Sequence, residues 1–202
     1  MARGTREALL VALEAAETEQ ALDDVLAERG FERAELTPPR APATVARSEA
    51  RFFDVDALEP TLSIVREWPS YSDATPWGAA LDLAEGLPAS ARMEMALPPA
   101  LSVLGRALSR RATVLGFASR EKPWHLVGVA FRGGRAIDVF TSVKNRVVVG
   151  AGGQPQPGTP EEARSRLVEW AAPHGGSAKA IEIVLGEHDL VSVWRFGYLH
   201  RD

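Results

Sequence analysis

The spacing of apolar residues predicts helices at the start of the chain. Residues 6–29 carry two apolar stripes at helical spacing, which are Leu9, Leu10 and Leu13 followed by Leu22, Val25 and Leu26. The two stripes are out of phase by roughly half a helical turn. They therefore predict two short helices or one kinked helix, which Gly30 would end in a left-handed conformation.

Four later helices are predicted from capping signals, in which a Thr or Asp side chain or a proline stands at the first turn. Their predicted ranges are 56–68, 75–86, 99–112 and 159–172. The first rests on Asp56 and Glu59 and the last on Thr159 and Glu162, because each pair has the three-residue spacing of a capping box.

Short apolar runs bounded by glycine, proline or charged residues predict strands. The predicted ranges are 91–97, 113–119, 124–131, 136–143, 146–151, 179–186 and 189–200. Gly133 and Gly134 separate two of these strands, and two glycines supply the positive φ angles of a tight hairpin. Helices followed by a strand-rich half indicate an α+β fold, with a mostly antiparallel sheet of about five or six strands and packed helices.

Proline content suggests a division of the chain into three parts. Residues 37–50 contain three prolines and few large apolar side chains, which is typical of a linker. Residues 1–36 would then form an acidic helical segment, and residues 51–202 an α+β domain. Residues 1–36 hold nine acidic and four basic side chains, a net charge of −5 in a chain whose net charge is −4.

Composition narrows the class of protein. The chain has 202 residues, 46% of them hydrophobic and 25% charged, which is ordinary globular usage. It lacks cysteine, a signal peptide and a long apolar run, so we expect a cytoplasmic protein that does not span a membrane. Ala, Arg, Gly and Pro are abundant and Lys is scarce, which is typical of a GC-rich genome and indicates a bacterial origin. The negative net charge disfavours nucleic acid as a partner.

The motifs of common catalytic sites are absent from the sequence. The serine-hydrolase motif Gly-x-Ser-x-Gly does not occur. The glycine-rich loop 150–153 does not indicate a phosphate site, because the helix after it opens with a proline, which lacks an N–H donor, and with two glutamates, which would repel a phosphate. The four histidines lack the spacing of a helical metal site. We therefore assign no catalytic residue, metal or cofactor, and favour a non-catalytic protein.

Two other classes stay open as alternatives. A metal-dependent hydrolase or nuclease would need Asp138, Glu182 and His188 to converge in a cleft. A small-molecule sensor would need an aromatic pocket, for which Trp77, Trp124 and Trp194 are the candidates.

The basic end of the helix predicted over 99–112 has two interpretations. Arg106 and Arg110 share one helix face, with Arg111 adjacent. These arginines either form the solvated back of an amphipathic helix or grip an anion or RNA.

The stretch 99–143 resembles the core of small bacterial immunity and defence-associated proteins. It runs helix, strand and hairpin, with Trp124 in one arm and Asp138 and Phe140 in the other. The acidic net charge, the absent catalytic motifs and the separate acidic N-terminal helices favour a regulatory, adaptor or immunity-type protein whose partner is another protein. The residues predicted to bind it are Trp124 and His125, together with Leu9, Leu13, Leu22 and Leu26 of the N-terminal helices. The same helices could also mediate self-association into a homo-oligomer.

Overall fold

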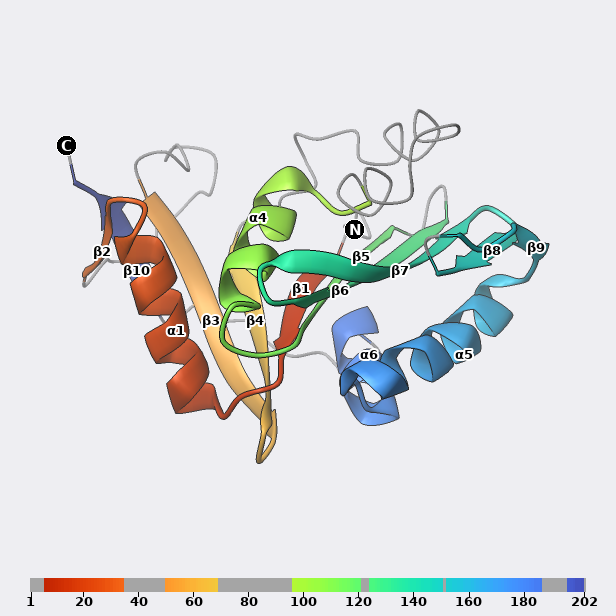
Figure 1. Ribbon diagram of the computed structural model, residues 1–202, viewed down its shortest axis with the longest axis horizontal. Helices are drawn as coiled ribbons and strands as arrows, with labels where there is room; N and C mark the ends of the chain where they lie inside the picture. Colours follow the sequence, from red (N-terminus) through yellow and green to blue (C-terminus); the bar gives the residue numbers. More distant parts are fainter. Residues whose placement is uncertain are drawn as a thin grey trace.

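The structure is a computed structural model of the whole chain, shown in Figure 1. It describes residues 6–34, 50–68, 96–120, 124–150, 152–186 and 196–201. The predicted helix 75–86, the greater part of the linker 37–50 and the predicted strand residues 91–95 and 189–195 lie outside these ranges.

Strands form the largest share of the described residues. They are β1 (Arg6–Val11), β2 (Phe31–Ala34), β3 (Ala50–Glu59), β4 (Leu62–Trp68), β5 (Val114–Arg120), β6 (His125–Arg132), β7 (Arg135–Val143), β8 (Arg146–Val149), β9 (Gln156–Pro157) and β10 (Phe196–His200). The helices are α1 (Ala15–Ala27), α4 (Pro99–Leu108), α5 (Pro160–Ala171), the 3₁₀ helix η3 (Ala172–His174) and α6 (Ala178–Leu185).

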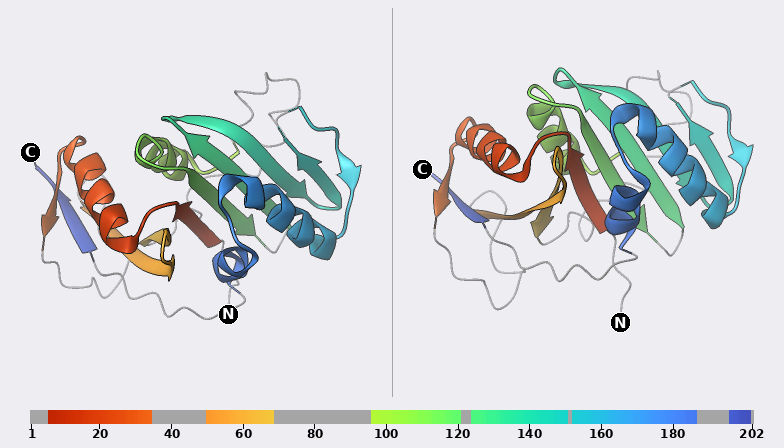
Figure 2. Two further views of the ribbon diagram at one scale, coloured as in Figure 1. Left: turned by 60° about the horizontal axis from the view of Figure 1, so that its bottom comes forward. Right: turned by 90° about the horizontal axis from the view of Figure 1, so that it is seen from below.

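All ten strands belong to one antiparallel sheet, in the order β2-β10-β3-β4-β1-β5-β6-β7-β8-β9. The α+β class and the antiparallel sheet are therefore confirmed, but the sheet has ten strands rather than five or six. Helices cover both of its faces, as Figure 2 shows, with α1 and α4 on one face and α5 and α6 on the other. Each face has its own hydrophobic core.

The N-terminal residues are a central strand and not a helix, so the helix predicted from residue 6 is wrong there. β1 lies between β4 and β5, and Leu9 is opposite both Val65 and Gly116. Successive β1 side chains enter opposite cores, with Leu9 in the α1–α4 core and Leu10 in the α5–α6 core. A strand buried on both faces is a continuous apolar run, which periodicity cannot distinguish from a helix.

The helix predicted over 56–68 is also wrong, because this stretch forms the β3–β4 hairpin. Asp56 is paired with Ile64 in the sheet, and its carboxylate binds Arg66 at 2.6 Å instead of capping a helix. The capping-box spacing at Asp56 and Glu59 was therefore coincidental.

The reverse error occurs at 179–186, where the predicted strand is helix α6. The Ser177 hydroxyl accepts a hydrogen bond from the Ala180 backbone N–H at 3.1 Å and so caps the helix, and Gly186 ends it at a φ of 73°. Both helix signals are local, but the β-branched residues between them favour the prediction of a strand. Ile181 and Val184 nevertheless face the core, as one side of an amphipathic helix does.

Several other local predictions are confirmed, although residues 96–97 are not part of a strand and the helix predicted to residue 112 ends at Leu108. Strands β5 to β8 and helix α5 occur where their patterns indicated, and a helix begins at Pro99. The hairpin glycines Gly133 and Gly134 have φ angles of 60° and 79°. No helix among the described residues is long and apolar enough to cross a membrane.

The described part of 1–36 is integral to the sheet and does not stand apart from it. β1, α1 and β2 pack with or pair to elements from across the chain, including the C-terminal strand β10. The Tyr198 hydroxyl on β10 donates to the Asp23 carboxylate of α1 at 2.6 Å. Burial and the neighbouring Asp23 charge both raise the pKa of Tyr198, so the phenol stays protonated and keeps this bond.

Candidate arginine-rich binding surface

Four exposed arginines meet at one end of α4. Arg110 and Arg111 follow the last turn of this helix, and Arg132 and Arg135 flank the β6–β7 turn. We call these four residues the arginine surface. An added Cβ on Gly134 would lie 3.5 Å from Cγ of Arg110, which places the turn directly against the helix end.

Ser109 connects the β6–β7 turn to the end of α4 through hydrogen bonds. Its carbonyl oxygen accepts from the Gly133 N–H at 2.8 Å, and its hydroxyl oxygen accepts from the Gly134 N–H at 3.1 Å. The same hydroxyl donates to the carbonyl oxygen of Arg106 at 2.9 Å. Because Ser109 is 2% exposed, these bonds are shielded from water, and the helix end and the turn are held in one position.

Arg132 and Arg135 are directly opposite each other across the hairpin. Like charges at directly opposed positions destabilise a sheet, so this pair opposes folding locally. The Arg132 Nε donates to the Thr113 hydroxyl at 3.3 Å, but neither arginine forms an ion pair with a carboxylate among the described residues. Local conflicts with folding are concentrated at functional sites in proteins.

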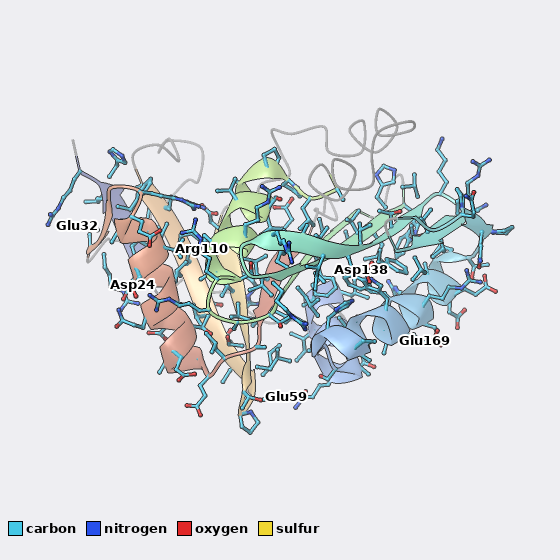
Figure 3. All side chains as sticks on the ribbon, in the orientation of Figure 1. Asp24, Glu32, Glu59, Arg110, Asp138 and Glu169 are labelled. Carbon is cyan, nitrogen blue, oxygen red and sulfur yellow. The ribbon has the colours of Figure 1, made fainter. Side chains whose placement is uncertain are left out.

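Helix α1 supplies acidic partners on the other side of the surface. Asp24 binds Arg111, and the Glu28 carboxylate lies 3.5 Å from Arg110. Figure 3 labels Asp24 on α1 and Arg110 on the side of α4 that faces it. The bond to Arg111, followed by one from Gln20, lowers the pKa of Asp24. Four arginines and two carboxylates leave a local charge of +2, whereas the net charge of the chain is −4.

The positive region continues inward to Arg29. This half-buried residue at the end of α1 donates from Nη2 to the carbonyl oxygen of Val103 on α4, at 3.4 Å. Burial lowers the pKa of Arg29, the nearby charges of Arg51 and Arg110 lower it further, and Glu28 opposes them. Crowding of positive charge is therefore a property of this whole corner of the molecule.

The predicted binding leucines lie inside the molecule. Leu9, Leu22 and Leu26 are fully buried in the α1–α4 core, and Leu13 is packed against it at partial burial. A partner could contact the three buried side chains only if α1 left the sheet. These apolar side chains therefore pack against other parts of the same chain rather than against a partner.

Trp124 and His125 are also held within the protein. The Trp124 indole N–H donates to the Ser142 hydroxyl at 3.2 Å, and the guanidinium carbon of Arg164 lies 5.6 Å from its ring centre. These contacts join the start of β6 to α5. His125 on β6 is only 7% exposed.

The carboxylate of Asp138 meets His174 rather than Glu182. A β-bulge at Ile137 places Asp138 opposite Ala130, on the sheet face that α5 covers. Its Oδ2 accepts from the Trp170 indole N–H at 3.0 Å and lies 3.1 Å from Nε2 of His174. Its Oδ1 accepts from the Val139 N–H at 2.8 Å. These contacts attach the end of α5 and η3 to β7.

The hydrolase and sensor alternatives gain little from this arrangement. Glu182 is exposed on α6, whereas His188 lies outside the described residues, as do Trp77 and Trp194. Among the described residues, no three His, Asp or Glu side chains are grouped so that they could hold a metal ion.

Comparison of the chain with protein-family models, with curated proteins and with solved structures found no match. The interpretation of the arginine surface therefore rests on its own geometry. The sequence contained both halves of the surface, but only the first half, at the end of α4, was considered as a binding feature. Nothing in the sequence pattern marks Arg132 and Arg135, which flank the glycine hairpin, as part of a binding surface.

Proposed function

We propose that the chain is a non-catalytic protein-binding protein, of the immunity, adaptor or regulatory type, and that the arginine surface contacts an acidic region of the partner. The observation that carries the proposal is the opposed pair Arg132 and Arg135, which flanks a turn bonded to Ser109 and forms no ion pair within the described residues. A partner carboxylate would relieve the repulsion that the folded chain leaves in place.

The nature of the surface favours a protein over a nucleic acid. Arginine binds carboxylates through two parallel N–H donors, so fixed guanidinium groups select carboxylates at fixed positions. The chain as a whole is also acidic.

Charge reversal tests the proposal. The chain carrying Arg132→Glu and Arg135→Glu is compared with the wild type and with Arg146→Glu, a change of an exposed strand arginine on β8. Partners captured from bacterial lysate are identified by quantitative mass spectrometry, and the enriched protein is purified and titrated directly. We expect wild type and Arg146→Glu to bind it and the double variant to lose binding. Equal binding by all three folded proteins would refute the proposal.

A further inference from the structure

Helix α1 shows how an acidic helix fits two neighbouring arginines of this surface. Asp24 and Glu28 are four residues apart, so their side chains project from the same face of the helix, about 6 Å apart along its axis. They reach Arg111 and Arg110, which are adjacent in the chain. One turn of an acidic helix is therefore enough to engage two arginines at this end of α4.

The hairpin presents a second pair of neighbouring arginines. Arg132 and Arg135 are directly opposed across two antiparallel strands, where Cβ atoms are typically about 5 Å apart. Two side chains that start from directly opposed positions can be engaged together by two carboxylates on successive turns of a helix, which lie about 6 Å apart along its axis. Since Ser109 holds the turn against α4, the pair is already positioned for binding.

We infer that the partner element recognised by the arginine surface is an acidic helix with two carboxylates four residues apart, which binds Arg132 and Arg135 as α1 binds Arg110 and Arg111. This inference rests on the proposed function and specifies the chemistry of the partner. A second copy of the chain could offer its Asp24 and Glu28 only by breaking their pairs with Arg111 and Arg110.

The spacing can be tested with synthetic helices and the full-length chain. Two fluorescein-labelled, alanine-rich peptides of equal length and charge are used, one with glutamates four residues apart and one with glutamates two residues apart, on opposite sides of the helix. Binding is measured by fluorescence anisotropy at low salt. We expect the first peptide to bind with an approximately five-fold lower Kd, which corresponds to one additional ion pair of about 1 kcal/mol.

The controls separate this inference from the proposed function. The preference for the first peptide should disappear in the Arg132→Glu, Arg135→Glu variant and persist in Arg146→Glu. Equal Kd values for the two peptides, no binding of either, or tighter binding of a single-stranded oligonucleotide of equal charge would overturn the inference. An association with a captured partner that still depended on Arg132 and Arg135 would then leave the proposed function standing. A concentration-dependent dimer that is lost on Asp24→Asn, Glu28→Gln substitution would instead assign the surface to self-association.

Discussion

Arg51 on β3 and Glu67 on β4 form a bidentate ion pair. The Arg51 Nε lies 2.8 Å from Oε1 of Glu67, and its Nη2 lies 2.7 Å from Oε2. The Glu67 side chain is 1% exposed, and the guanidinium carbon lies 5.0 Å from the centre of the Phe53 ring. Removing one charge from a buried pair of this kind strongly reduces the stability of the folded protein.

Replacing Glu67 with Gln should strongly destabilise the protein. The change removes the buried negative charge that faces Arg51, and breaking buried pairs in this way costs about 3–5 kcal/mol. Urea unfolding followed by circular dichroism measures the effect. Glu169→Gln, at an exposed position on α5, is the matched control and should change the unfolding free energy little. A loss below about 1 kcal/mol for Glu67→Gln would show that Arg51 finds water or another partner.

Removing residues 1–36 should prevent folding, in contrast to the expectation from sequence that residues 51–202 fold alone. The truncation removes β1 from between β4 and β5 and exposes the cores on both sides of it. Leu9 and Val11 are 0% exposed, and without them the apolar side chains that pack against them would be exposed to water. A chain that lacks only residues 1–5 and keeps all of β1 serves as the control. A cooperative thermal transition in the shorter chain would contradict the prediction.

Asp138→Ala should destabilise the protein by about 1–3 kcal/mol, because the Trp170 indole N–H loses its acceptor in a partly buried position. The His174 ring loses its partner at the same time. Chemical denaturation measures the change, and Glu169→Ala, an exposed change on the same helix as Trp170, is the control. If Asp138 were a catalytic residue, Asp138→Ala would leave the unfolding free energy unchanged and abolish function instead.

Gly134→Ala should cost about 1 kcal/mol or more, because a φ of 79° is strained for a residue with a Cβ. Gly152→Ala is the matched control, since an added Cβ there has nothing within 4 Å and its φ is not in the left-handed region. Denaturation curves of the two variants separate backbone strain from the mere addition of a methyl group. Equal stability of both would refute the assignment of strain to the turn.

The capping box of α5 predicts a pH-dependent contribution from Glu162. Its carboxylate accepts from the Thr159 backbone N–H at 2.7 Å, and this bond lowers the pKa of Glu162 below its ordinary value of 4.5. The ionised side chain thus favours the folded state above that pH, and the contribution is lost as the pH falls through the lowered pKa. Wild type should therefore be more stable than Glu162→Gln near pH 7, and the difference should vanish on acidification. A constant difference between pH 7 and pH 3 would contradict this explanation.

Local signals correctly predicted the hairpin between β6 and β7 and the start of α5. The glycine pair at 133 and 134 predicted its hairpin because only positive φ angles close so short a turn. Thr159 and Glu162 likewise predicted the start of α5, since both bonds of a capping box lie within four residues. The strands β5 to β8 followed from the apolar runs between such turns.

Tertiary contacts decided the elements that the sequence alone left ambiguous. The run at 6–11 is a strand only because β4 and β5 flank it and both of its faces are buried, which no periodicity reveals. Asp56 carries the residue type of a helix cap, yet it pairs with Arg66 on a neighbouring strand.

The arginine surface also belongs to the tertiary structure. By itself the sequence determined that arginines end one helix and flank one tight turn. It could not show that the turn docks on that helix, because the Ser109 bonds to Gly133 and Gly134 join segments more than twenty residues apart. Charges that are remote along the chain interact only after folding has brought them within a few ångströms, and so the binding surface exists only in the folded molecule.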